Sequence, residues 1–202
     1  MAVNAKAVVG DGRGDNRMNL LDAAAARFSA QGYAGTSMRD IAADVGIKAG
    51  SIYYHFEAKS ELLVAVHEEG IRRITRSVEQ AINSAQPPRQ RLQAAMIAHL
   101  QEILNGGDYA QVVLRELLPV DDPRHQRFRQ ARNGYEDIFR RLIDDLGISS
   151  ATKRRHLRLL LLGALNWSPM WYRAGGQQPA EIAAGFLELV QTGCEQGRDA
   201  DE

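Results

Sequence analysis

The sequence predicts an all-α protein of nine helices, and three observations support this fold class. Apolar residues recur at helical spacing in successive stretches of the 202-residue chain, and no stretch shows the alternation expected of a β-strand. Glycine and proline residues separate these stretches. The composition is 45% hydrophobic but only 6% aromatic, which suits helices rich in Ala and Leu. We expect three N-terminal helices in one domain and six helices in a second.

The first segment with helical periodicity begins near residue 16. Residues 1–16 contain Gly and Asp without periodicity, and we expect them to form a flexible N-terminal arm. A helix is expected from Asn16 to about Gln31, with one apolar face. The members of that face are Leu20, Ala24 and Phe28.

The next two expected helices are short and are joined by a tight turn. Ser37 followed by Asp40 is close to a capping box at the start of a helix. Gly46 stands where that helix must end in a left-handed residue. Ile52 and Phe56 repeat at an interval of four residues on the following helix. Helix, glycine turn, helix is the layout in which the second helix enters the DNA major groove, so this segment is predicted to bind DNA.

Six further helices are expected in the second domain, residues 59–202. Proline pairs and glycines mark where most of them end. The expected limits are Lys59 to about Ser84, Pro88 to about Asn105, Tyr109 to about Leu118, Asp122 to about Leu146, Ser149 or Ser150 to about Arg173, and Pro179 to about Gln196.

Short motifs follow one another at fixed spacing through the first third of the chain. They are Leu20-Leu21-Asp22-Ala23-Ala24, Phe28, Gly32-Tyr33, Gly35-Thr36-Ser37-Met38-Arg39-Asp40-Ile41-Ala42, Val45-Gly46-Ile47, Gly50-Ser51-Ile52-Tyr53-Tyr54-His55-Phe56 and Lys59-Ser60-Glu61-Leu62-Leu63. These motifs resemble the DNA-binding domain of the TetR family of bacterial transcriptional repressors. The family usually places Ser or Thr before the recognition helix and often Lys next, whereas Lys48 and Ala49 stand here. The resemblance implies a helix-turn-helix domain over residues 17–58 and a ligand-binding and dimerisation domain over residues 59–202.

The resemblance also implies which side chains face the duplex. On a helix without this resemblance, the same polar residues would be expected to face solvent. The expected DNA-contacting residues are Thr36, Ser37, Arg39, Lys48, Ala49, Gly50, Ser51, Tyr53, Tyr54, His55 and Lys59. The first two would bind phosphate, the last three would hold the backbone on the far side, and the run from Lys48 to Tyr53 would enter the major groove. Arg13 and Arg17 either reach a minor groove from the arm or belong to a free tail.

The overall charge gives no sign of a nucleic-acid-binding protein. The chain has 25 basic and 25 acidic residues, and residues 1–60 contain seven basic and six acidic ones. DNA binding must therefore depend on a local arrangement of charges and helix N-termini, not on bulk charge.

Other classes of function find little support in the sequence. The single cysteine, Cys194, excludes an internal disulfide and a Cys-rich zinc site. No stretch has transmembrane length and the N-terminus lacks the apolar run of a signal peptide, so a cytoplasmic protein without a membrane partner is expected. No nucleophile–base arrangement supports an enzyme, and no cofactor is predicted. Asp121, Asp122 and His125 share a turn, but such groups more often cap helices than hold a metal.

The C-terminal half contains the expected dimer interface. Residues 159–165 are nearly all apolar, and a helix that is apolar all round must be buried on several sides. One side would face the domain core and the other a second subunit, as the resemblance to homodimeric repressors of palindromic operators implies. The residues expected across the two-fold axis are Leu160, Leu161, Leu165, Trp167, Phe186 and Val190.

A ligand pocket is expected among the helices of the second domain. Its expected lining is Met96, His99, Leu100, Arg115, Phe128, Tyr135, Phe139, Leu165 and Met170. His99, Arg115 and Tyr135 would orient the ligand within apolar walls. The candidates for binding its charged end are Arg127, Arg132 and Arg173.

The nature of the ligand follows from this lining and from the chain's C-terminal end. The apolar walls indicate a hydrophobic or amphipathic effector. The Trp-Tyr-Arg and Gly-Gly motifs near residue 175 resemble those of TetR relatives that control fatty-acid, steroid or other acyl-CoA catabolism. We therefore expect a homodimeric repressor that such a small molecule releases from its operator. The alternative is a DNA-binding regulator or activator with no effector.

Overall fold

The structure is a computed structural model, and it describes residues 12–83, 87–115 and 118–196. Every regular element in these ranges is a helix, which confirms the all-α prediction. The elements are α1 (Gly12–Gly35), α2 (Met38–Asp44), a 3-10 helix η1 (Ser51–Tyr54), α3 (Lys59–Asn83), α4 (Pro88–Asn105), α5 (Gly107–Arg115), α6 (His125–Asp144), α7 (Ala151–Asn166), α8 (Ser168–Trp171) and α9 (Pro179–Gln196).

Two helices of the N-terminal part differ from the expected ones. Helix α1 begins at Gly12, so the last residues of the expected arm are helical, and the backbone bends at Gly32, where φ is 74°. The expected recognition helix is one 3-10 turn, η1, and not an α-helix. This part of the chain therefore presents a short turn where the sequence predicts a longer helix.

Two helices of the C-terminal part also differ. Helix α6 begins at His125, because the Asp122 carboxylate accepts a hydrogen bond from the backbone N–H of Arg124 and stabilises a turn before the helix. The helix that Ser150 caps ends at Asn166, and α8 follows it as a separate turn with Pro169 near its start. A proline has no N–H to continue the preceding helix, which accounts for this break.

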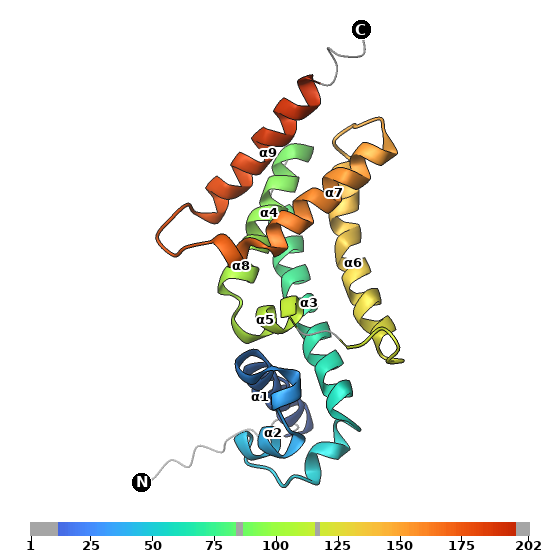
Figure 1. Cartoon of the computed structure of the whole chain (residues 1–202), viewed down its shortest axis with the longest axis vertical. Coiled ribbons are helices and arrows are strands. Elements are labelled where there is room, and N and C mark those ends of the chain that lie inside the picture. Colours follow the sequence, from blue (N-terminus) through green and yellow to red (C-terminus); the bar gives the residue numbers. More distant parts are fainter. Residues whose placement is uncertain (1–11, 84–86, 116–117, 197–202) are drawn as a thin grey trace, which may run out of the picture.

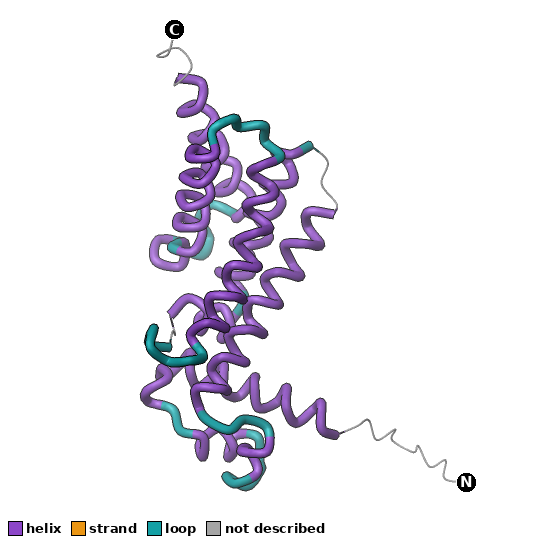
Figure 2. Tube along the Cα trace, turned by 90° about the vertical axis from the view of Figure 1, so that its right-hand side faces the viewer, coloured by secondary structure: helices purple, strands orange, loops and turns teal. Residues whose placement is uncertain are grey.

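The described chain forms an elongated bundle (Figures 1 and 2). Helices α1 and α2 lie at one end, and α7, α8 and α9 lie toward the other (Figure 1). The long helix α3 leads from the first end into the body of the bundle, where it packs along α4.

The apolar residues form two clusters, which we call the head core and the body core. The head core contains apolar side chains of α1, α2, η1 and the first turns of α3, together with Tyr109 and Val112 of α5. The body core contains the later turns of α3 with α4, α6, α7 and α9. Because α3 contributes to both, the boundary between them passes through this helix, and any displacement of α3 moves both parts.

Candidate DNA-binding surface and effector cavity

Helix α2 begins in the capping box that the sequence predicts. The backbone N–H of Asp40 donates to Ser37 Oγ over 3.2 Å, and the N–H of Ser37 donates to Asp40 Oδ2 over 3.3 Å. The Ser37 hydroxyl also donates to Asp40 Oδ2 over 2.6 Å. Its proton is therefore used within the cap, which leaves the hydroxyl oxygen free only to accept a further hydrogen bond.

The turn after α2 depends on Gly46. Its φ of +74° is left-handed, a conformation that glycine adopts without the strain of a Cβ atom. The N–H of Ile47 then donates to the carbonyl of Ala42 and closes the end of the helix. Arg27 of α1 pairs with both carboxylate oxygens of Asp44, with Nη2 2.7 Å from Oδ1, and so fastens α2 to α1.

Most of the expected DNA-contacting side chains are exposed. Tyr54 is 91% exposed and Tyr53 is 54% exposed, whereas Ile52 and Phe56 are buried in the head core as expected. Ser51 and His55 are half-buried beside them. The exposed members of the set are Ser37, Arg39, Lys48, Ala49, Gly50, Tyr53 and Tyr54. Large exposed aromatic side chains next to basic ones suit contact with a nucleic acid.

Thr36 and Lys59 have structural roles that the sequence did not indicate. Thr36 is 2% exposed, and its hydroxyl donates to the carbonyl of Gly32 over 3.0 Å. The ammonium of Lys59 donates to the carbonyls of Tyr33 and Thr36 over 2.7 and 2.8 Å, and it lies 4.3 Å from the centre of the Tyr33 ring. The Thr36 hydroxyl thus bonds within the end of α1, and Lys59 fastens that end to the start of α3. The phosphate-binding role expected of these two side chains stays a prediction.

Of the two arginines expected on the arm, only Arg17 has a described side chain. It belongs to α1, and its guanidinium lies 5.1 Å from the centre of the Phe56 ring. The side chain of Arg13 and residues 1–11 lie outside the described part.

A cavity of about 240 Å³ lies within the body, between α3, α4, α5, α6 and α7. Apolar side chains dominate its wall, and a few polar ones interrupt them. The lining residues are His67, Ile71, Ile74, His99, Ile103, Val113, Leu114, His125, Phe128, Arg129, Arg132, Tyr135, Glu136, Leu162 and Asn166. Such a mixed lining is typical of small-molecule sites.

The cavity contains only part of the expected lining. His99, Phe128 and Tyr135 line it, and so does Arg132, which we expected near the mouth. The members that lie elsewhere are Met96, Leu100, Phe139 and Leu165, which are buried in the body core, and Arg115 and Met170, which are exposed. Arg173 is exposed in the loop after α8.

The sequence analysis missed the part of the wall that α3 contributes. His67, Ile71 and Ile74 follow one another at intervals of four and three residues, which is the spacing of one helix face. That spacing could have identified the face, but it is equally typical of core residues. Only the structure distinguishes the two.

Two buried histidines and one tyrosine supply much of the polarity of the cavity. His99 Nδ1 lies 2.5 Å from the Tyr135 hydroxyl oxygen, and the His67 ring lies 4.3 Å from the Phe128 ring. Burial lowers the pKa of His67 to about 4, and the charge of Arg132 acts in the same direction. Burial also lowers the pKa of His99 to about 4, although a side-chain hydrogen bond with Asn166 acts in the opposite direction. Both rings are therefore neutral at neutral pH.

The turn before α6 has groups that could suggest a metal site. The Asp122 carboxylate accepts from a backbone N–H, and His125 Nδ1 lies 2.9 Å from the carbonyl oxygen of Leu118. Within the described residues, no group of three or more His, Cys, Asp or Glu side chains is placed to hold a metal ion. The same residues contain no helix that is long and apolar enough to span a membrane.

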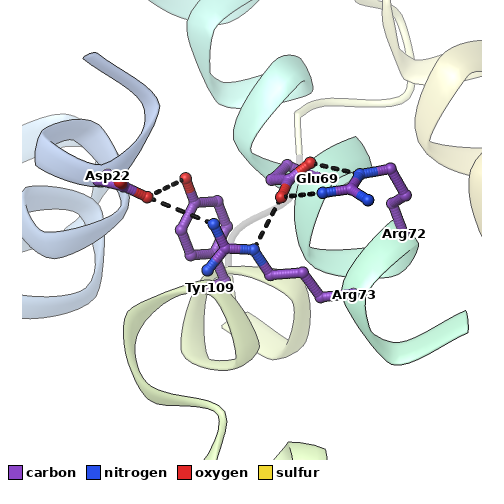
Figure 3. A network of polar contacts seen from close by, with 5 residues as sticks. All are labelled: Asp22, Glu69, Arg72, Arg73 and Tyr109. Carbon is purple, nitrogen blue, oxygen red and sulfur yellow. Dashed lines mark hydrogen bonds and ion pairs between the residues drawn. The ribbon is translucent and has the colours of Figure 1, made fainter. Parts of the chain in front are cut away.

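A polar network joins α1, α3 and α5 (Figure 3). The Tyr109 hydroxyl of α5 donates to Asp22 of α1 over 2.8 Å, and the Arg73 guanidinium of α3 lies 3.9 Å from the centre of the Tyr109 ring. Arg72 and Arg73 both donate to the buried carboxylate of Glu69. Burial would raise the pKa of Glu69, but these hydrogen bonds outweigh it and hold the pKa below its usual range.

Helix α5 packs very closely on α3 at Gly70. A Cβ atom at that position would lie 2.6 Å from Val113 Cγ2 and 3.2 Å from the Tyr109 carbonyl oxygen. Val113 also lines the cavity, whereas Tyr109 contacts Asp22 of the head. Helix α5 therefore contacts the cavity through Val113 and Leu114 and the head through Tyr109.

Helix α6 is tied to the first half of α3 by ion pairs. Arg127 donates to Glu61 over 2.6 Å and to Glu68 over 2.7 and 2.8 Å. Arg127 is thus engaged by two carboxylates, and the expectation that it binds the charged end of a ligand is not supported.

Large apolar side chains are exposed on α7, α8 and α9. We call the following set the apolar patch: Leu159, Leu160, Trp167, Met170, Trp171 and Leu189. Phe186 is half-buried and packs edge-on against Trp171. Leu161 and Leu165, which we expected at a dimer interface, are buried in the body core instead. One face of α7 thus packs in the body core, and another face is exposed on the surface.

Comparison with known proteins shows that both the head and the body match protein-family models. The family model described as "Bacterial regulatory proteins, tetR family" matches residues 20–66, and the one described as "Tetracyclin repressor-like, C-terminal domain" matches residues 85–194. The chain belongs to the TetR family. It is accordingly a helix-turn-helix transcriptional regulator with a ligand-binding C-terminal domain.

Individual proteins resemble the chain over most of its length. The HTH-type transcriptional repressor KstR2 of Mycolicibacterium smegmatis is 28% identical over 195 residues, which cover 90% of this chain and 92% of KstR2. The crystal structure described as superantigen PfiT has a TM-score of 0.77 and 31% identity, and covers 91% of this chain and 97% of its own. The structure of AibR with isovaleryl coenzyme A and operator DNA has a TM-score of 0.74 and 22% identity, and covers 86% and 97%. At that identity the AibR likeness shows the fold alone.

Proposed function

We propose that this TetR-family protein is a homodimeric repressor that leaves its operator when a small hydrophobic or amphipathic ligand occupies the cavity. One observation carries the proposal: α5 lies between the cavity and the head. Val113 and Leu114 of α5 line the cavity, and Tyr109 of the same helix donates a hydrogen bond to Asp22 of α1. A ligand that displaces α5 would thus reposition the head.

The mechanism is a shift between two populations of the dimer. A ligand that binds one arrangement of α3 and α5 more tightly than the other favours that arrangement by the difference in its binding free energies. The Glu61 and Glu68 pairs with Arg127 transmit the position of α6 to α3 in the same way. The ligand-bound arrangement holds the two heads at a separation that no longer matches successive major grooves.

The apolar patch supports the homodimer. Its large exposed side chains, among them Leu160 and Trp167 at 63% exposure each, are unusual on a monomeric surface. A two-fold axis beside α7 and α9 would bury this surface against its copy and direct the two heads at a palindromic operator. A stable interface of this kind buries ~2,000 Å² or more.

The effector class that suits the cavity is an acyl compound. Its walls are mostly apolar, and the exposed residues Arg129 and Arg132 at its edge can meet a carboxylate or a phosphate. A volume of about 240 Å³ suits an acyl chain but not a whole CoA ester, whose nucleotide would stay outside. The relative AibR was crystallised with isovaleryl coenzyme A and operator DNA, which supports this class. We place the protein in the cytoplasm, where DNA and such esters meet, and assign no catalytic step to it.

Titration of the protein–operator complex with isovaleryl-, octanoyl-, decanoyl- and stearoyl-CoA tests the proposal. We expect at least one ester to release the DNA at micromolar concentration, while free CoA does not. Operator binding that no ester affects would favour the second candidate, a regulator without a small-molecule effector. The cavity within the body is the observation that makes this candidate the weaker one.

A further inference from the structure

A second hollow, which we call the polar depression, lies beside the start of α6 and has a volume of about 470 Å³. Apart from Val120 and Pro123, its lining side chains are polar or charged. The polar depression shares His125 and Arg129 with the cavity, so the two spaces adjoin. A ligand whose apolar part fills the cavity would therefore pass these two residues and place its remaining part in the polar depression.

The charges around the polar depression disfavour a phosphate there. Its wall has two carboxylates, those of Asp121 and Asp122, but only one guanidinium, that of Arg129. The Asp122 carboxylate lies 3.5 Å from the Arg124 guanidinium, whereas Asp121 is exposed and has no such partner among the described residues. Because like charges repel, the pyrophosphate of a nucleotide would gain little in this place.

Three amide side chains form a stripe along α6 at the wall of the polar depression. Gln126, Gln130 and Asn133 follow one another at intervals of four and three residues, which is the spacing of one helix face. None of the three side chains is hydrogen-bonded to another described residue. Each side-chain amide has both donors and an acceptor, so the stripe complements a ligand that itself contains amides.

The two residues shared with the cavity also suit an amide. His125 Nδ1 lies 2.9 Å from the Leu118 carbonyl oxygen, which can only accept, so the neutral ring has its proton on Nδ1. Nε2 of this neutral ring is then an acceptor for an N–H group. Arg129, one helical turn later on the same face, has only donors and suits a carbonyl oxygen.

We infer that the effector is a thioester whose thiol component contains secondary amides, as the pantetheine arm of coenzyme A does, and that the polar depression binds these amides. In the pantetheine arm, two methylene groups separate the two secondary amides. Gln126 and Gln130 lie about 6 Å apart along the helix axis, which is a comparable distance. The acyl chain fills the cavity and the arm lies along the amide stripe, so the nucleotide contributes little to affinity. The inference rests on the proposed release by an acyl compound and specifies which part of that compound is recognised outside the cavity.

Three thioesters with the same decanoyl chain test this inference on the full-length protein bound to its operator. Their thiol components are coenzyme A, pantetheine and mercaptoethanol, of which the last has no amide. We expect the first two thioesters to release the operator at concentrations within about threefold of each other. The mercaptoethanol thioester should need an at least ~10-fold higher concentration, because the hydrogen bonds of both amides are lost. Isothermal titration of the DNA-free protein should give the same order of dissociation constants.

Matched substitutions locate the effect on α6. Gln130→Leu removes the donors and the acceptor of one amide, and should reduce the difference between the pantetheine and mercaptoethanol thioesters by about threefold. Gln126→Leu should act in the same direction. Gln101→Leu, at an exposed position of α4 outside both spaces, should leave the difference unchanged. All three glutamines are exposed, so both apolar cores stay intact in these variants.

The outcomes separate this inference from the proposed function. Equal release by the pantetheine and mercaptoethanol thioesters, or a difference that persists when Gln126 and Gln130 are both replaced by Leu, would overturn the inference and leave the acyl-responsive repressor intact. A coenzyme A thioester at least ~10-fold more effective than the pantetheine thioester would also overturn it, because the nucleotide would then be recognised. Failure of every thioester to release the operator would overturn the proposed function, and the inference with it.

Discussion

The head and the body of the molecule differ in how completely they satisfy their own groups. In the head, the buried Thr36 hydroxyl has an acceptor, and the Lys59 ammonium has two. The three buried side-chain atoms that lack a partner among the described residues, in His67, His99 and Ser168, all lie beyond the start of α3. The apolar patch also belongs to the body. Among the described residues, the head thus pairs its buried polar groups more completely than the body, and the body also exposes more large apolar side chains.

The largest effect on dimerisation and operator binding is expected from a substitution in the apolar patch. Trp167→Glu places a charge where the second subunit would pack, and we expect a monomer whose operator affinity is at least ~100-fold lower, because one head makes only half of the contacts. Analytical ultracentrifugation and operator titration would measure this. Gln101→Glu introduces the same charge on the exposed face of α4 and should change neither property. If the Trp167→Glu protein remained a dimer, the apolar patch would not be part of the dimer interface.

The buried histidines of the cavity predict a pH dependence of stability. Folding holds the pKa values of His67 and His99 near 4, below the unfolded value of 6.5, so the unfolded state binds more protons between these pH values. The free energy of unfolding should therefore fall as the pH decreases from 6.5 to 4, by up to about 3 kcal/mol per histidine. Urea unfolding at a series of pH values would measure the slope. His99→Gln should flatten it, whereas His156→Gln, at an exposed position, should not. An unchanged slope in His99→Gln would show that His99 does not titrate in this way.

The close contact of α5 with α3 is tested at two helical glycines. Gly70→Ala forces Val113 and the Tyr109 backbone away, and we expect it to lower the free energy of unfolding by about 1–3 kcal/mol. Gly134→Ala on α6 has no neighbour within 4 Å of the new Cβ, and should raise it by about 0.5–1 kcal/mol because alanine favours the helix. Thermal and urea unfolding of both variants would show opposite signs. A stabilising Gly70→Ala would mean that the two helices are not in such close contact.

Smaller effects are expected from two cationic residues of the head, of which Lys59 supports the fold and Arg39 is expected to face the DNA. Lys59→Ala removes two hydrogen bonds to backbone carbonyls and should destabilise the protein by about 1–2 kcal/mol. Arg39→Ala should leave stability unchanged, but should reduce the salt dependence of operator binding by about one phosphate contact. Fluorescence anisotropy at several salt concentrations and urea unfolding would measure both. If Lys59→Ala changed only the salt dependence of operator binding, the phosphate-binding role that the sequence predicts for Lys59 would be supported.

The sequence predicted the head in more detail than the body, for a physical reason. Caps and turns are local, so Ser37, Asp40 and Gly46 specify their hydrogen bonds within a few residues. The inward orientation of Thr36 depends on the bend at Gly32, four residues earlier, and the sequence analysis placed both residues without predicting that bend.

The cavity requires information from several helices at once. Met96 and His99 are both buried and lie three residues apart, yet only His99 lines the cavity. Periodicity identifies a buried face but does not show whether another side chain or a void lies opposite it. The split into α7 and α8 of the helix expected from Ser149 or Ser150 to about Arg173 was foreseeable from Pro169 alone.

The most direct test of the connection between body and head is the coupling free energy between acyl ester and operator in the wild type and in Tyr109→Phe. The substitution keeps the ring beneath Arg73 but removes the hydrogen bond to Asp22. The operator dissociation constant would be measured with and without saturating decanoyl-CoA, and the ester dissociation constant with and without operator, because the two ratios must agree. We expect a ratio of at least ~10 in the wild type and about two- to threefold in Tyr109→Phe, with the ester affinity of the free protein unchanged. An equal ratio in both proteins would contradict the account, because α5 would then not connect the cavity to the head.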